Sequence, residues 1–254
     1  MSGDPAPVAV RLPVLEWGLG GRRRALLVHG VSASGAGWWR VASALAEQGV
    51  AVTAPDLRGH GGAPAGTRYR LADLAADLVP LGSRWDVVVG HSFGGPVVLE
   101  LARSGAVHVA ALVLVDPFLG ADDMAALVVD QVAEVRASRD AARVAADNLR
   151  WHPDDAHHKA AAARAVSPGT VERWFTDNAP WDGRVAALAQ VAVPTHVVGA
   201  DPAVGALFTP AQEAVVTANP LVTVERAAGA GHSVHRDDPA PVVAAVLRAL
   251  GEEA

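Results

Sequence analysis

The stretch that decides the fold runs from Trp85 to Gly95 and reads WDVVVGHSFGG. Its first part, Trp85–Val89, is apolar and rich in valine, which predicts a buried strand. The residues Phe93–Arg103 that follow predict a helix. Between the two, GHSFG fits the pattern Gly-x-Ser-x-Gly, in which a serine occupies a strained strand-to-helix turn and needs small neighbours. Ser92 is therefore the candidate nucleophile.

Short apolar runs alternate with longer helical stretches on both sides of this turn. The other predicted strands are Val8–Trp17 (a strand or a hairpin), Ala25–His29, Val50–Ala54, Ala110–Val115, Thr195–Val198 and Leu221–Glu225. The other predicted helices are Trp38–Gln48, Tyr69–Leu81, Pro210–Ala218 and Pro239–Leu250. Strands and helices in alternation form right-handed crossovers, which build a mostly parallel sheet with helices on both faces. The chain is thus predicted to be an α/β protein.

The alternation stops between residues 118 and 184, where the sequence is rich in alanine and helical without a clear strand. We interpret 118–184 as a helical cap or lid inserted over the carboxyl edge of the sheet. Residues 1–117 and 185–254 then form one core domain, which agrees with the chain length of 254 residues.

Composition excludes several classes of function. The net charge of −6 is mixed along the chain, so we expect no nucleic-acid partner. There is no cysteine, hence no disulfide framework and no thiolate metal site, and we expect no metal ion. We also expect no membrane partner and a cytoplasmic location, because the sequence has no signal-peptide pattern and no apolar run of roughly 20 residues. A single lysine beside abundant arginine and alanine points to a bacterial source.

A serine hydroxyl needs a base to remove its proton. Among the ten histidines, His232 has the most suitable place, because it follows the last predicted strand in the glycine-flanked loop AGAGHS. His91 adjoins the nucleophile, but we expect its side chain to point away around the turn. His29 and His60 are interpreted as structural loop residues, and the pair at 157 and 158 as solvated side chains of a cap helix.

The base in turn needs a carboxylate that orients it and stabilises its charged form. Asp201 follows the strand Thr195–Val198 and gives the chain order serine, acid, histidine. Asp116 follows the strand Ala110–Val115 and is the alternative. We favour Asp201, while both carboxylates remain open at this stage.

Acyl transfer also requires hydrogen-bond donors for the developing oxyanion. One candidate is the backbone N–H of Phe93, directly after the nucleophile. The second is the backbone N–H of Val31, in the loop that follows the early strand and contains Gly30.

These motifs, in this order, resemble those of α/β-hydrolases along nearly the whole chain. The matching pieces are VHG at 28–30, APDLRGHG at 54–61, GHSFGG at 90–95, residues 194–201 and the pair Gly231-His232. The resemblance implies an eight-stranded, mostly parallel sheet, a helical cap, a nucleophile–acid–base triad and no cofactor. It also implies that the loop 56–61 shapes the pocket without taking part in catalysis.

The sequence departs from the family at the acid. Family members commonly have Gly-x-x-Asp, whereas Gly199-Ala200-Asp201 is one residue shorter. Some relatives, among them certain dehalogenases and fungal-toxin lactonases, carry their acid after the preceding strand, which is the place of Asp116. A serine nucleophile implies esters, lactones, thioesters or carbon–carbon bond hydrolysis, since relatives that act on haloalkanes or epoxides use aspartate there.

The cap contains Trp151, Trp174 and Trp181, which we expect to line an apolar pocket together with Gly30. The sequence therefore predicts a serine hydrolase for a small apolar ester or lactone. The alternatives are a slow-turnover ligand receptor or regulator of the same fold, a cofactor-free perhydrolase or haloperoxidase, and a carbon–carbon bond hydrolase.

Overall fold

The computed structural model describes residues 9–251, so Val8 of the first predicted strand lies outside it. The main sheet has seven strands in the order β1-β3-β2-β5-β7-β8-β9. These strands are β1 (Val14–Trp17), β2 (Arg23–Val28), β3 (Val50–Pro55), β5 (Val87–His91), β7 (Leu112–Val115), β8 (Thr195–Ala200) and β9 (Val222–Ala227). Strand β1 pairs antiparallel with β3, and all other neighbours in this sheet are parallel. The predicted α/β class with a mostly parallel sheet is confirmed.

Two strand predictions differ from the structure in detail. Within residues 9–251 the main sheet has one strand fewer than the eight that the resemblance implied, because the segment before β1 forms no strand. Pro13, which has no N–H for a sheet ladder, ends that segment. The predicted strand Trp85–Val89 is divided at Asp86, and its first residue belongs to β4 (Arg84–Trp85), which pairs with β6 (His108–Val109) in a separate small sheet.

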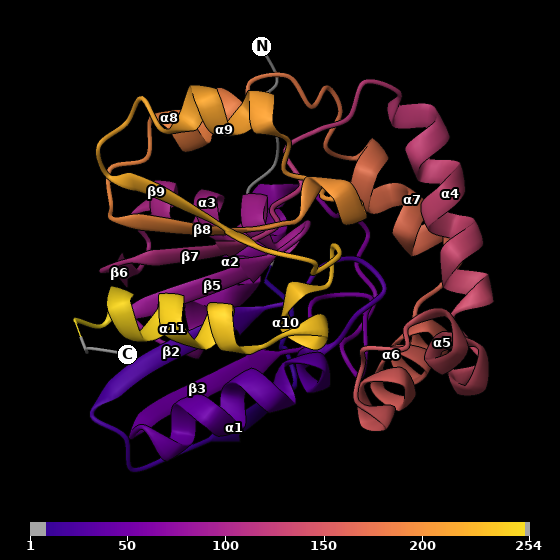
Figure 1. Cartoon of the computed structure of the whole chain (residues 1–254), viewed down its shortest axis with the longest axis horizontal. Coiled ribbons are helices and arrows are strands. Elements are labelled where there is room, and N and C mark those ends of the chain that lie inside the picture. Colours follow the sequence, from indigo (N-terminus) through magenta and orange to yellow (C-terminus); the bar gives the residue numbers. More distant parts are fainter. Residues whose placement is uncertain (1–8, 252–254) are drawn as a thin grey trace.

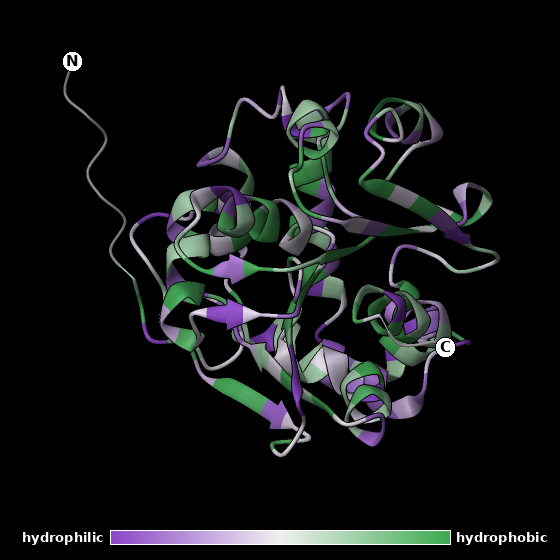
Figure 2. Cartoon of the chain, turned by 90° about the vertical axis from the view of Figure 1, so that its left-hand side faces the viewer, coloured by the Kyte–Doolittle hydropathy of each residue, from purple (hydrophilic) through white to green (hydrophobic). Residues whose placement is uncertain are grey.

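Helices cover both faces of the main sheet (Figure 1). One face packs on α1 (Trp39–Glu47) and α11 (Ala240–Ala249). The other packs on α2 (Leu71–Leu78), α3 (Gly94–Ser104), α8 (Arg184–Ala189) and α9 (Pro210–Val216). Figure 2 shows hydrophobic residues, in green, along the strands and on the helices that pack against them. The sheet therefore separates two hydrophobic cores, and this burial is the main favourable term in folding.

Short helical turns complete the core. They are η1 (Gly35–Trp38), η2 (Val79–Leu81), η3 (Pro202–Val204) and α10 (Val234–Asp237). The predicted helix Tyr69–Leu81 is thus α2 followed by η2. Pro80 accounts for the change, since proline has no N–H for the helical ladder.

Five helices lie between β7 and β8, of which α8 is the last, and the first four lie inside the stretch 118–184 that was predicted as a cap; we call these four the cap helices. They are α4 (Met124–Ala137), α5 (Ala141–Asp147), α6 (Pro153–Ala165) and α7 (Pro168–Thr176). In Figure 1 they lie together on the right, beyond the edge of the sheet at which α10 also lies. No helix among residues 9–251 is both long and apolar enough to cross a membrane.

One buried ion pair ties the loop after β3 to α2. The Arg58 guanidinium donates to both carboxylate oxygens of Asp77, at 2.6 Å each, and both side chains are buried. Asp77 also accepts from the backbone N–H of Val10. Asp77 raises the pKa of Arg58 against the opposing effect of burial. The loop at 56–61 is therefore held from inside the core.

Asp77→Ala should lower the free energy of unfolding by about 3–5 kcal/mol, because it removes the carboxylate that accepts two hydrogen bonds from the buried Arg58 guanidinium. Glu225→Gln is the matched control. It breaks a pair with Arg248 of equal length, 2.6 Å, in which both side chains are about 40% exposed, and should cost less than about 1 kcal/mol. Urea unfolding of the two variants tests the difference, and equal losses would contradict it.

Candidate active site

Ser92 follows β5 directly and has a left-handed backbone, with φ of 53°. A non-glycine residue at such an angle is strained and is found where the surrounding structure enforces it. Two glycines let the neighbouring backbone pack closely enough around Ser92 to hold this angle. A Cβ atom on Gly90 would lie 2.6 Å from the Gly94 carbonyl oxygen, and one on Gly94 would lie 2.5 Å from the Val28 carbonyl oxygen. The predicted strand-to-helix turn is thus present, with Ser92 at its apex.

His232 lies in the loop between β9 and α10, and its side chain is 31% exposed. Its Nε2 is 2.9 Å from the Ser92 Oγ, so the predicted nucleophile and base are within hydrogen-bond distance. The other ring nitrogen, Nδ1, is 2.6 Å from the Asp116 Oδ2. With Asp116 ionised, Nδ1 carries the proton that it donates to the carboxylate, and Nε2 is left to accept the serine proton.

Asp116 follows β7, which is paired with β5, so its Cα is one strand away from Ser92. Its side chain is fully buried. Besides His232, the carboxylate accepts from three backbone N–H groups, those of Ala200, Leu207 and Phe208. These bonds hold the carboxylate in place and compensate the burial of its charge.

The preference for Asp201 as the partner of His232 is wrong in this structure. The Asp201 carboxylate accepts from the backbone N–H groups of Ala203, at 2.9 Å, and Gly229, at 2.8 Å. The bond from Gly229, and then that from Ala203, lowers the pKa of Asp201. Asp201 follows β8, which is one strand further from β5 than β7 is. Its carboxylate is directed to the N–H groups of Ala203 and Gly229 instead of to His232.

Gly30 lies against the nucleophile, where a Cβ atom on it would come within 2.8 Å of the Ser92 Cβ. Val31 follows, and then Ser32, whose φ of 54° is also left-handed. Among the described residues, the backbone N–H groups of Val31 and Phe93 have no hydrogen-bond partner. The two predicted oxyanion donors are therefore available on the loops that flank Ser92.

His91 positions the base, a role that sequence reasoning missed. Its Nε2 donates to the backbone carbonyl of His232 at 3.0 Å, and the two rings are 4.8 Å apart. Burial, followed by the charge of His232, holds the pKa of His91 well below its usual value. His91 therefore acts as a neutral donor. No sequence signal marks this contact, because it joins the last residue of β5 to a loop 141 positions away in the chain.

The other histidines singled out in the sequence have local contacts. The ring of His29 donates to the Gly30 carbonyl oxygen and accepts from the Leu57 N–H, and His60 packs on Trp174. His157 is exposed. Within residues 9–251 no group of three His, Cys, Asp or Glu side chains could hold a metal ion.

A cavity of about 770 Å³ opens beside His232, between the cap and the core. Its lining comes from the cap helices α4, α5 and α6 and from the loops around the base. Most of its charged side chains belong to the cap: Glu134, Arg143, Asp147, Arg150 and Lys159, with Asp237 from the core. Of the three groups at the site, His232 therefore borders a cavity that carries several charged side chains.

The prediction that three cap tryptophans line this pocket is wrong for two of them. Trp151 lines the cavity, and its Nε1 donates to Asp237. Trp174 is fully buried and Trp181 nearly so, and both pack on Phe93. They belong to the hydrophobic core because they pack in one buried cluster with Phe93, Phe118 and Phe175.

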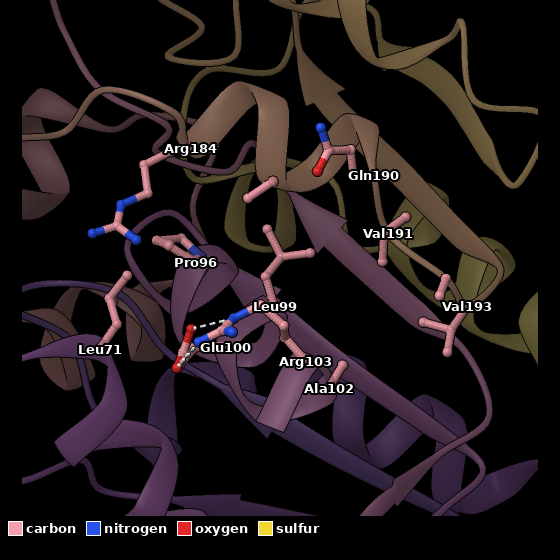
Figure 3. A pocket seen from close by; sticks show the side chains of 12 residues that line it. Leu71, Pro96, Leu99, Glu100, Ala102, Arg103, Arg184, Gln190, Val191 and Val193 are labelled. Atoms are coloured by element: carbon pink, nitrogen blue, oxygen red, sulfur yellow. Dashed lines mark hydrogen bonds and ion pairs between the residues drawn. The ribbon is translucent and has the colours of Figure 1, made fainter. Parts of the chain in front are cut away.

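A second cavity, of about 580 Å³, lies between α3 and α8 (Figure 3). Its polar rim includes Arg184 and the ion pair of Glu100 with Arg103. None of Ser92, His232 and Asp116 lines it, so it is separate from the candidate active site.

The fold is that of an α/β hydrolase, and sequence comparison agrees. Residues 25–245 match the model of the alpha/beta hydrolase family. The chain belongs to that family, as the resemblance indicated.

Individual relatives match only part of the chain. A lipase named LipV, from Mycobacterium tuberculosis, is 41% identical over a segment that covers 44% of this chain and 44% of that protein. A putative carbamate hydrolase, RutD, from Variovorax paradoxus, is 40% identical over 36% of each chain. The chain thus matches less than half of the length of these relatives.

The similarity of structure extends further. The esterase EaEST from Exiguobacterium antarcticum superposes with a TM-score of 0.76 at 18% identity, covering 95% of this chain and 96% of that one. An identity this low establishes the fold alone.

Asp116→Asn should slow the reaction of Ser92 with a fluorophosphonate probe by about 10³–10⁴-fold, because the amide favours the wrong histidine tautomer. Asp201→Asn is the matched control and should react within about threefold of the wild type. Labelling rates with peptide mapping test this. If Asp201→Asn gave the larger loss, or if the probe modified a residue other than Ser92, the assignment would be overturned.

Acid should destabilise the fold. Burial holds the pKa values of His60, His91 and His235 well below 6.5. As pH falls below 6.5, the unfolded chain binds protons that the folded chain does not, so stability falls by up to about 1.4 kcal/mol per pH unit for each group. Urea midpoints at pH 8 and pH 5.5 measure this. His235→Gln should reduce the dependence on pH, while His157→Gln at an exposed position should not.

Proposed function

We propose that this protein is a serine hydrolase that cleaves a carboxylic ester or a lactone through an acyl-enzyme on Ser92. The observation that carries the proposal is the continuous line from the Ser92 Oγ through His232 to the buried Asp116 carboxylate, with contacts of 2.9 and 2.6 Å. A hydroxyl aligned on an imidazole, which is itself aligned on a carboxylate, is the arrangement for acyl transfer.

In the first half of the proposed reaction, the Ser92 oxygen forms a bond to the substrate carbonyl carbon while its proton passes to the His232 Nε2. The N–H groups of Val31 and Phe93 would hold the oxyanion, and a single donor of this kind contributes about 2.7–4 kcal/mol. The carbon–oxygen bond to the leaving group then breaks, and His232 returns the proton to that group.

In the second half, a water molecule gives its proton to His232 and attacks the acyl carbon. The bond to the Ser92 oxygen breaks, and the proton returns to that oxygen as the acid is released. His91 supports both halves, because it holds the backbone of the base while remaining neutral itself.

The expected apolar substrate is supported only in part. The expectation rested on the cap tryptophans, of which Trp174 and Trp181 pack in the core rather than line the cavity. The charged side chains around the cavity instead support a small substrate with a polar part.

Turnover of short 4-nitrophenyl esters and simple lactones tests the proposal. The wild type should hydrolyse at least one of them, and Ser92→Ala should lower the rate at least about a thousandfold. Tight binding without turnover would contradict the proposal and favour a receptor. Activity that requires peroxide and an organic acid would favour the perhydrolase alternative.

A further inference from the structure

Lys159 is the one lysine of the sequence, and its position is unusual for a lysine. It lies on the cap helix α6, lines the same cavity as His232, and is only 8% exposed. Lysine is almost never this buried without a partner or a task. The mechanism above leaves Lys159 without a role, although its side chain reaches the active-site cavity.

The ammonium group has two partners, one from the core and one from the cap. It donates to the Ser32 Oγ at 2.7 Å and forms an ion pair with the Glu134 Oε1, also at 2.7 Å. An ammonium carries three N–H donors. Among the described residues these two contacts use two of them, so one donor is left for a ligand in the cavity.

The Lys159 and Glu134 side chains differ in how firmly they are held. The Lys159 side chain is 10% exposed and is fixed on Ser32, whereas the Glu134 side chain is 46% exposed. Lys159 lowers the pKa of Glu134, so this carboxyl is ionised at neutral pH. Because an ion with access to water loses little when it leaves its partner, Glu134 is the exchangeable member of the pair.

The position of Lys159 relative to the nucleophile suits a substrate with two ends. Ser32 is two residues after Gly30, and Gly30 lies against Ser92. The Cα atoms of Gly30 and Ser32 are therefore at most about 7 Å apart. The nucleophile and the ammonium are thus both next to the loop at 30–32, and Lys159 lines the same cavity as the His232 ring.

The other cationic side chains that line the cavity have partners of their own. Arg143, which is 62% exposed, pairs with Asp147 at 3.5 Å. Arg150 donates to the Gly229 carbonyl oxygen. Lys159 is thus the buried cation of the lining that faces an exchangeable carboxylate.

We propose that Lys159 binds a carboxylate carried by the acyl part of the substrate, and that Glu134 occupies this position when no substrate is present. The substrate class is then a mono-ester of a short dicarboxylic acid. This inference rests on the proposed function for its reaction, but the binding of a dicarboxylate does not depend on turnover.

Two esters of equal chain length test the inference. The mono-4-nitrophenyl ester of glutaric acid carries a carboxylate where 4-nitrophenyl pentanoate carries a methyl group. Lys159→Met should lower kcat/KM for the glutarate ester about tenfold to a hundredfold, the effect of one lost hydrogen bond between charged groups. The pentanoate ester should change by less than about threefold. Spontaneous hydrolysis, measured with Ser92→Ala, is subtracted.

Two further variants keep the test decisive. Glu134→Gln removes the competing carboxylate and should lower KM for the glutarate ester while leaving the pentanoate ester unchanged. Arg136→Met removes an exposed cation of α4 that does not line the cavity, and it should leave both esters unchanged. Equal losses for the two esters in Lys159→Met would overturn the inference, because the lysine would then only tie the cap to the loop at Ser32.

Binding of free glutarate separates this inference from the proposed function. Calorimetry on Ser92→Ala should detect glutarate binding that is lost in Ser92→Ala/Lys159→Met and kept in Ser92→Ala/Arg136→Met. If glutarate binds through Lys159 but neither ester is hydrolysed, the proposed function fails and the binding site stands. If both esters are hydrolysed by Ser92 and glutarate does not bind, the inference about Lys159 fails alone.

Discussion

The pairing of β5 with β7 is the constraint on which the rest of the site depends. Ser92 and Asp116 each follow the last residue of one of these strands, and His91 is opposite Val115 in the register. Ser92 and Asp116 both have a left-handed backbone, with φ of 53° and 39°. Since parallel strands end at the same edge of a sheet, a nucleophile and a carboxylate placed there can be bridged by one imidazole.

The imidazole is held from three directions. Asp116 binds one of its nitrogens, Ser92 is at the other, and His91 binds its backbone carbonyl. The carboxylate is in turn fixed by amides of the loop after β8. Each member is therefore held by contacts with a different part of the structure.

The cap completes the site through polar contacts rather than through an apolar surface. Lys159 reaches Ser32 in the oxyanion loop, Trp151 reaches Asp237 beside the base, and the Trp39 ring N–H reaches Asp155 on α6. These contacts join residues more than 80 positions apart in the chain. The helices α4, α5 and α6 thus add charged groups to the lining of the cavity that His232 also borders.

Local sequence determined the α/β class, the strand-to-helix turn at Ser92 and the identity of His232 as the base. Each of these follows from residues adjacent in the chain: an apolar run, glycines where a Cβ atom would collide, and a glycine-flanked histidine after the last strand. Only the tertiary structure decided that Asp116 rather than Asp201 holds the base, that His91 supports it, and that Trp174 and Trp181 belong to the core. Those outcomes depend on which strands are neighbours and on where side chains turn after the strands end, and neither is encoded in short-range spacing.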